Sequence, residues 1–175
     1  MAAMTTVILG ENFEVQELIE QRRALGQDGR DEMWDGVYYM TPHANMAHAL
    51  LQMELGGLLR SRASARGLLV SGEFNLGDAH DYRIPDLGLH RSASNAVYVP
   101  TAAMIVEILS PNDLTFEKFD FYGQHGVEEI LVADVDERSI RCWTYDGSSK
   151  SYLEGNRSAL LELSCDDLRE AISWP

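Results

Sequence analysis

Two carboxylates stand in parts of the chain that otherwise predict buried β-structure. Asp86 follows a proline in the segment 84–87, and Glu107 lies inside the apolar segment 104–109, Met-Ile-Val-Glu-Ile-Leu. An apolar run of this length is typical of a strand that is buried on both faces. An ionised carboxylate in such a strand is unfavourable unless it has a partner, and a metal ion is one such partner.

The two acids and a lysine that follows them predict a metal-dependent nuclease site. If the strands that carry Asp86 and Glu107 pair, their carboxylates can face each other and bind Mg2+ or Mn2+, because hard divalent cations prefer oxygen ligands. Such a metal can activate a water molecule and offset charge on a phosphoryl oxygen. Lys118, expected on the next helix, could orient that water or stabilise the pentavalent phosphate. Asp86, Glu107 and Lys118 are therefore the candidate catalytic residues, and the two acids are the candidate metal ligands.

Each of these residues also has an ordinary structural explanation. An Asp after a proline, such as Asp86, is typical of a turn that faces solvent. Glu107 can belong to a buried salt bridge, although a buried Glu without a partner is rare. A lysine such as Lys118 is most often an exposed helix residue. The hypothesis of catalysis therefore depends on the three residues occurring together in this order.

The charge of the chain argues against a DNA substrate. Its 28 Asp and Glu residues exceed its 14 Lys and Arg residues, which gives a formal net charge of -14 at pH 7. Nonspecific affinity for DNA comes from cations that neutralise phosphates, so a nuclease of this charge needs a local basic groove. Two small basic clusters, Arg22-Arg23 and the group Arg60, Arg62 and Arg66, are better explained as cations near the C-terminal ends of helices.

The composition is that of an ordinary globular protein. The chain has 175 residues, of which 45% are hydrophobic and 24% charged, and these values predict one domain with a substantial core. No apolar stretch reaches the roughly 18–20 residues of a membrane span, and residues 1–10 lack the pattern of a secretory signal. Cys142 and Cys165 are too few for a disulfide framework and form no Cys-x-x-Cys pair. We therefore expect reduced thiols in a cytoplasmic protein.

The N-terminal half predicts two helices and four strands. Asp35-Gly36 is a strong signal for a two-residue hairpin turn, and Thr41-Pro42 is typical of a helix start. Pro85 cannot donate a ladder hydrogen bond, so its strand is expected to lie at an edge or to bend there. The expected elements are a helix over residues 14–25, a hairpin of strands 32–34 and 37–40, a helix over 43–65, and strands over 68–76 and 82–90.

The C-terminal half predicts a strand-helix-strand unit followed by a hairpin. A unit of this kind implies a parallel pair of strands. The whole pattern predicts an α/β or α+β fold, with a mixed β-sheet flanked by α-helices. The expected elements are a strand over 102–109, a helix over 114–125 capped by the turn 110–113, a strand over 129–135, a hairpin of 139–145 and 150–153, and a last helix within 164–173 that begins with a capping box at Ser164.

Several of these motifs occur together in an order that resembles the Uma-two family, whose members are described as restriction endonucleases of the PD-(D/E)XK superfamily. The resemblance covers about residues 13–153. The residues that carry it are Pro85-Asp86, the segment 106–111 Val-Glu-Ile-Leu-Ser-Pro, Lys118, Tyr122, Gly126-Val127 and Glu129, with Glu32, Asp35-Gly36, the segment 40–42 Met-Thr-Pro and His48 upstream.

The resemblance implies a single restriction-endonuclease-like domain over residues 1–175, with a core at about 13–153 and acids on the central strands. It also implies Mg2+ or Mn2+ as cofactor, DNA as substrate and a homodimer, because a duplex has two strands to cut. In the superfamily the lysine usually stands two residues after the second acid, where this chain has Leu109. Members of the family resemble this chain in placing a lysine on the following helix, which matches Lys118. The chain also lacks the aromatic pair of the family segment Pro-Glu-Tyr-Trp at positions 128–131.

Three further residues are candidates for supporting roles. Glu32 could complete the metal shell or hold Lys118, and its ordinary explanation is an exposed strand residue beside a hairpin. His48, near the start of a predicted helix where the protonated form is disfavoured, could contact the metal water or a phosphate, or could be a buried structural histidine. Arg83 could pair with an active-site acid or with a phosphate.

Three classes of function remain open from the sequence. The first is a Mg2+-dependent endonuclease that hydrolyses DNA phosphodiester bonds, which the acid, acid and lysine set favours. The second is a dimeric binding or regulatory module that keeps the nuclease fold with weak or no cleavage, which the net charge of -14 favours. The third, a small-molecule hydrolase, would need a nucleophile motif such as Gly-x-Ser-x-Gly, and the sequence has none.

Overall fold

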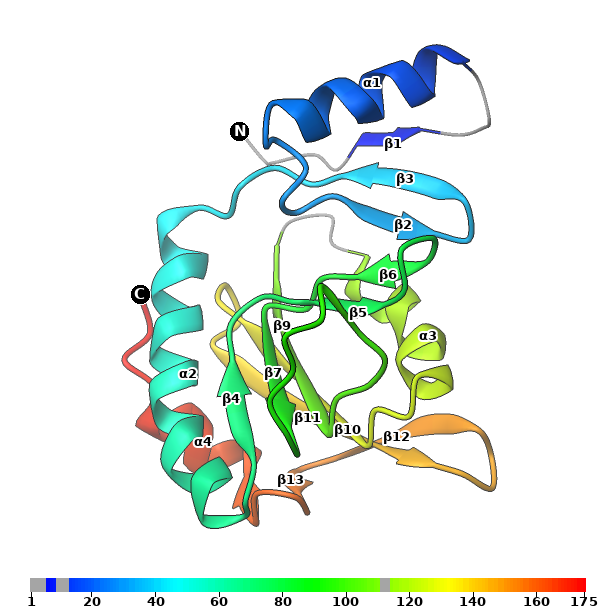
Figure 1. Cartoon of the computed structure of the whole chain (residues 1–175). Helices are drawn as coiled ribbons and strands as arrows, with labels where there is room; N and C mark the ends of the chain where they lie inside the picture. Colours follow the sequence, from blue (N-terminus) through cyan, green and yellow to red (C-terminus); the bar gives the residue numbers. More distant parts are fainter. Residues whose placement is uncertain (1–5, 9–12, 111–113) are drawn as a thin grey trace.

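The computed structural model describes residues 6–8, 13–110 and 114–175, and within them the chain forms mixed β-sheets flanked by α-helices (Figure 1). This confirms the predicted fold class. The sequence predicted a single mixed sheet, whereas the described residues form two six-stranded sheets and one small two-stranded sheet. No helix in the described part of the chain has the length and apolar character needed to cross a membrane.

The six-stranded sheet that contains β9 and β10 is here called the central sheet. These two strands are parallel and are buried on both faces. Strands β9 and β10 pair in parallel, as the strand-helix-strand pattern predicted, and their neighbours on either side are antiparallel. In order across the sheet, its strands are β12 (Ser151–Gly155), β11 (Ser139–Asp146), β10 (Glu129–Asp134), β9 (Met104–Leu109), β7 (Leu87–His90) and β4 (Leu69–Ser71).

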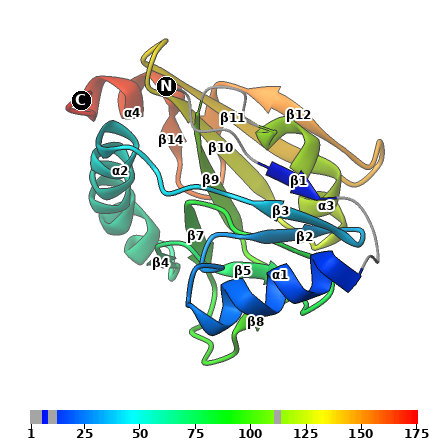
Figure 2. The ribbon, with the colours of Figure 1, turned by 90° about the horizontal axis from the view of Figure 1, so that it is seen from above.

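Helices cover both faces of the central sheet (Figures 1 and 2). Helices α2 (Met46–Ala65) and α4 (Cys165–Ala171) pack on one face, where Val106 and Ile108 of β9 join their core. A 3-10 helix η1 (Thr115–Lys118) leads into α3 (Phe119–Gln124), and α3 packs on the opposite face with Ile105 of β9. Because side chains alternate along a strand, Glu107 shares the face of Ile105 and points toward the η1–α3 side.

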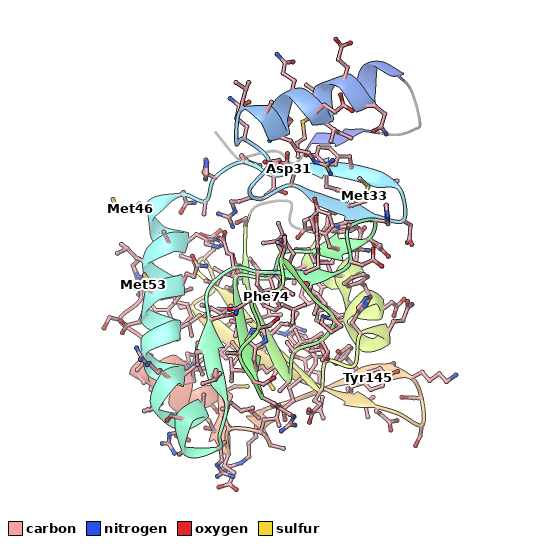
Figure 3. All side chains as sticks on the ribbon, in the orientation of Figure 1. Asp31, Met33, Met46, Met53, Phe74 and Tyr145 are labelled. Atoms are coloured by element: carbon pink, nitrogen blue, oxygen red, sulfur yellow. The ribbon has the colours of Figure 1, made fainter. Side chains whose placement is uncertain are left out.

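The second six-stranded sheet lies across the end of the central sheet, below α1 (Phe13–Ala24) in Figure 1. The buried carboxylate of Asp31, which Figure 3 labels, fixes this region. It accepts hydrogen bonds from Arg22 of α1, from the hydroxyl of Tyr38 and from the N–H of Thr41. In order, its strands are β1 (Thr6–Ile8), β3 (Val37–Met40), β2 (Glu32–Trp34), β6 (Tyr82–Arg83), β5 (Asn75–Gly77) and β8 (Tyr98–Val99).

The prediction of two long strands over residues 68–76 and 82–90 is wrong. The first segment splits into β4 in the central sheet and β5 in the second sheet. The second segment splits into β6 in the second sheet and β7 in the central sheet. The second break falls at Pro85, which has no N–H for a ladder bond, and the chain bends there as expected. At this bend the chain passes from the second sheet into the central sheet. Asp86 therefore lies directly before β7.

Two helix starts also differ from the sequence prediction. Helix α2 begins at Met46 and not near His43, because the side chain of Asn45 accepts a hydrogen bond from the N–H of His48 at 2.9 Å and acts as the N-cap. The predicted helix over 114–125 is the short η1 followed by α3. Of its predicted cap 110–113, residues 111–113 lie outside the described residues.

The C-terminal helix has the predicted cap but different bounds. The hydroxyl of Ser164 accepts the N–H of Asp167 at 3.0 Å, and α4 runs from there over Cys165–Ala171. The chain reaches α4 through the small sheet of β13 (Arg157–Ser158) and β14 (Leu163–Ser164). This segment is attached to the central sheet by the buried carboxylate of Glu129 on β10.

Glu129 makes this attachment with three hydrogen bonds. Its Oε2 accepts the hydroxyl of Ser158 at 2.5 Å, and its Oε1 accepts the N–H groups of Ala159 and Leu160 at 2.8 and 3.1 Å. An amide at position 129 would turn one acceptor into a donor that faces other donors. We therefore expect Glu129→Gln to lower the free energy of unfolding by about 2–3 kcal/mol, as measured by urea denaturation.

The matched control is Glu128→Gln, one residue earlier. The Glu128 side chain is 47% exposed and pairs with the exposed Arg91, so its loss should change the free energy of unfolding by less than about 0.5 kcal/mol. Equal effects of the two substitutions would contradict the role assigned to Glu129.

Candidate active site

The carboxylate of Glu107 is held by two side chains from the η1–α3 segment. Glu107 is only 3% exposed, and its Oε1 accepts hydrogen bonds from Lys118 Nζ at 3.3 Å and from the hydroxyl of Tyr122. Lys118 and Tyr122 are four residues apart, a spacing that places two side chains on the same side of a helical segment. The apolar strand therefore tolerates the Glu107 carboxylate, because the Lys118 ammonium group and the Tyr122 hydroxyl donate hydrogen bonds to it.

Lys118 joins Glu107 to a second buried acid from the other sheet. Its Nζ lies 3.1 Å from Oε1 of Glu32 on β2. Glu32 is fixed in turn by the N–H of Ile84 and by the indole N–H of Trp34, both at 2.7 Å. The Glu32–Lys118–Glu107 bridge therefore connects the second sheet to the central sheet at the point where the chain crosses between them.

Asp86 lies between the peptide that follows Glu107 and the side chain of His48 on α2. Its Oδ2 accepts the N–H of Ile108, next to Glu107, at 2.8 Å. Its Oδ1 lies 2.8 Å from Nε2 of His48 and 3.4 Å from Nη2 of Arg30. The antiparallel register of β7 and β9, with Leu87 opposite Val106, accounts for this position, because Asp86 directly precedes Leu87.

The site is therefore a buried cluster of three carboxylates at the junction of the two sheets, which we call the acid cluster: Glu32, Asp86 and Glu107. The structure brings together all three residues of the predicted catalytic set, with Lys118 on Glu107 and Asp86 on the adjoining peptide. Glu32 contacts Lys118, and His48 contacts Asp86. These two supporting candidates are thus buried residues of the same cluster.

Arg83 does not have the partner that the sequence suggested. Its Nη1 lies 2.6 Å from Asp81 and 2.7 Å from the carbonyl of Met33, and none of its hydrogen bonds goes to the acid cluster. Its guanidinium stacks between the rings of Trp34 and Phe121, with centroids at 4.6 and 4.0 Å. The proposed pairing of Arg83 with an active-site acid is therefore corrected: it packs on Trp34, which holds Glu32.

The sequence analysis missed several polar side chains of the cluster. Tyr122 was noted among the residues that carry the family resemblance, and its spacing of four residues from Lys118 is the signal that could have assigned it to the site. Arg30 and the side chain of Gln52, which donates to the carbonyl of Asp86 at 2.7 Å, carry no such signal. Their contacts arise only from the tertiary packing of α2 and of the loop before β2.

Burial makes the acid cluster electrostatically unusual. The pKa of Glu107 is raised to about 8, chiefly because burial disfavours its charged form. Lys118 lowers this pKa, whereas the negative charges of Asp86 and Glu32 raise it. The hydroxyl of Tyr122 has a pKa raised well above its usual value, mainly by burial, so it remains a hydrogen-bond donor to Glu107.

The donor set fits a hard divalent cation. Asp86 and Glu107 supply carboxylate oxygens, and Mg2+ is commonly held by one or two carboxylates with water and substrate oxygens. Burial is the main cause of the raised pKa of Glu107, and the charges of Asp86 and Glu32 raise it further, an effect that a bound cation would offset. Among the described residues, no three His, Cys, Asp or Glu side chains are arranged to hold a metal together. The fit is therefore to a site with two protein carboxylates.

Comparison with known proteins finds similarity to a family and to a solved structure that are both described as nucleases. The profile of the Uma2 (Uma-two) family, described as "Putative restriction endonuclease", matches residues 15–172. A crystal structure described as "a putative nuclease belonging to DUF820 from Anabaena variabilis ATCC 29413" is 16% identical and superposes with a TM-score of 0.63 over 81% of this chain and 90% of that chain. At this identity the structural match concerns the fold. A search of the curated proteins found no match.

The pKa of Glu107 predicts how stability varies with pH in the absence of metal. The folded pKa of about 8 exceeds the ordinary value of 4.5, so the folded state binds the proton more tightly than the unfolded state. Stability should therefore fall as pH rises between these two values and level off above the folded pKa. Glu107→Gln removes this contribution, so the variant should gain stability relative to the wild type as pH rises, measured as Tm in EDTA.

Glu117→Gln provides the control, because Glu117 is an exposed acid on η1, the 3-10 helix that carries Lys118. Its difference in Tm from the wild type should not vary with pH over this range. A constant difference for Glu107→Gln as well would show that Glu107 is not the group that titrates.

Proposed function

The chain belongs to the Uma2 family, and on that premise we propose that it is an endonuclease that uses a divalent cation, Mg2+ or Mn2+, to hydrolyse phosphodiester bonds in DNA. The observation that carries the proposal is the juxtaposition of Asp86, Glu107 and Lys118 in one buried cluster. Buried acids with strongly perturbed pKa values gather at functional sites more often than in ordinary cores. We further propose a cytoplasmic location, in keeping with two free cysteines.

In this proposal Asp86 and Glu107 are the metal ligands. A divalent cation bound there would supply a more acidic water and positive charge near the phosphoryl group. Lys118 is the one ammonium group in contact with Glu107 among the described residues. Its role would be to donate hydrogen bonds to the attacking water or to the phosphate oxygens, in place of the lysine expected at position 109.

The remaining side chains of the cluster would position these three. Glu32 holds the Lys118 ammonium from the second sheet, and Tyr122 fixes one oxygen of Glu107. His48 and the N–H of Ile108 hold the two oxygens of Asp86. All these groups are attached to strands or helices of the fold, which gives a catalytic arrangement the rigidity that it requires.

Asp86→Ala and Lys118→Ala test the proposed nuclease directly. Each should reduce cleavage of supercoiled and linear DNA in Mg2+ or Mn2+ by about 100-fold or more, because each removes a group assigned to metal binding or to the reacting phosphate. EDTA should abolish cleavage by the wild type. Gel analysis of the DNA products over time gives the rates.

Asp120→Ala and Lys150→Asn are the controls, since Asp120 and Lys150 are exposed and outside the cluster. Asparagine is chosen at position 150 because Lys150 has a positive φ of 55°, which asparagine tolerates well. Cleavage that survives both test substitutions would refute the proposed site. A metal-induced rise in Tm that requires Asp86, without cleavage of any DNA tested, would support the binding-module alternative suggested by the net charge of -14.

We also propose that the protein is a homodimer that associates through the outer face of α2. Met46, Leu50 and Met53 follow a helical repeat on this face and are 77%, 55% and 77% exposed. In Figure 3 the side chains of Met46 and Met53 point away from the body of the protein. The opposite side of α2 carries His48 and contacts Asp86, so an interface on the outer face of α2 would leave the acid cluster uncovered.

The dimer predicts a sedimentation result. Wild-type protein at micromolar concentration should sediment as a dimer, and Met53→Glu should shift it to a monomer, because a charge in an apolar interface is strongly unfavourable. Val97→Glu, at a 70% exposed position outside α2, should leave the dimer intact. A monomeric wild type, or equal effects of both substitutions, would exclude an interface on this face.

A further inference from the structure

The two cysteines of the chain lie together on the face of the central sheet opposite to Glu107, where Leu131 of β10 lies between Cys142 and Val106. Cys142 is on β11, where its partner on β12 is Gly155. The N–H of Cys165, the first residue of α4, donates to the carbonyl of Asn156 at 2.7 Å. Since Gly155 and Asn156 are consecutive, the backbone brings both cysteines next to the same turn of chain, with α4 packed against β11.

The side chains of the two cysteines meet in one small cavity between α4 and the central sheet. Leucines form much of the rest of its wall, among them Leu131, Leu161 and Leu168. Cys142 is buried, whereas Cys165 is partly exposed, and neither forms a disulfide. Of the two residues, Cys165 is therefore the more accessible to solvent and Cys142 the more shielded.

The two thiols also differ in acidity. Interaction with the Cys165 thiol, together with burial, raises the pKa of Cys142. Interaction with the Cys142 thiol lowers the pKa of Cys165, against the opposing effects of burial and of nearby acids such as Asp166. The exposed thiol is thus the better nucleophile of the two, because the thiolate is the reactive form.

We propose that Cys142 and Cys165 are a redox-active dithiol that forms a reversible intramolecular disulfide in response to hydroperoxides. The Cys165 thiolate attacks the peroxide, so that a sulfur–oxygen bond forms, the oxygen–oxygen bond breaks and the alcohol or water leaves with the proton. The sulfur of Cys142 then attacks this sulfenic acid, which forms the disulfide and releases water. Two thiols are oxidised by two electrons, and one hydroperoxide is reduced.

The disulfide would fasten α4 to the central sheet. In the reduced protein α4 is a short helix near the C-terminus, attached through the Ser164 cap, Leu168 and the segment that Glu129 holds. A covalent link from Cys165 to β11 restricts the unfolded chain between the two cysteines. We expect oxidation to raise Tm by roughly 5–10 °C, reversibly with dithiothreitol.

Treatment of the native full-length protein with hydrogen peroxide tests the proposal. After oxidation the wild type should lose about 2 Da and should bind no iodoacetamide at either cysteine once it is denatured. Peptide mapping should show one peptide pair joined through Cys142 and Cys165. Dithiothreitol should restore both thiols and the original Tm.

The single variants separate the two roles. Cys142→Ala should stop at a Cys165 sulfenic acid that dimedone traps, and Cys165→Ala should leave Cys142 reduced. Two thiols that remain open to alkylation in the treated wild type, or disulfide-linked dimers in place of the internal link, would overturn the proposal. These wild-type results decide the question even where a variant does not fold.

Discussion

The position of Glu107 is the constraint on which the rest of this structure depends. A carboxylate in the middle of a strand buried on both faces cannot be left without partners, since the charged form is strongly disfavoured there. The chain meets this requirement with Lys118 and Tyr122, and Lys118 in turn requires Glu32. Each partner comes from a different element, so the electrostatics of one strand fix how the η1–α3 segment and the second sheet pack against it.

A buried ion pair of this kind is weak grounds for stability. Removing charges from water costs about as much as their attraction returns, and apolar side chains of similar volume often serve a core equally well. In this protein Glu32 and Glu107 share Lys118, whereas Asp86 pairs with His48 and lies 3.4 Å from Arg30. Burial still raises the pKa of Glu107 to about 8. The acid cluster is therefore weak grounds for stability, and the proposed role in binding a cation would give these residues a function that packing does not.

How much of this the sequence could predict depended on the range of the interactions. Strands β9 and β10 were evident because their apolar runs are continuous, and the hairpin of β2 and β3 because Asp35-Gly36 is a local turn signal. The segments 68–76 and 82–90 were mistaken for two long strands, because no local propensity says which of two sheets a short strand will join. The start of α2 was misplaced because the Thr41-Pro42 signal competed with Asn45, whose side chain supplies the N-cap in the structure.

The site, too, contains residues that local sequence signals identify and residues that only tertiary packing brings in. Asp86, Glu107 and Lys118 stood out by residue type and order, whereas Arg30 and Gln52 reach Asp86 only through tertiary packing.

The charge of the chain gives the cation a second role in the proposed reaction. With a net charge of -14 and Lys118 already bound to two acids, the protein offers few cations to neutralise phosphates. A divalent cation on Asp86 and Glu107 would therefore attract the substrate as well as activate the water, and its binding would have to precede that of DNA.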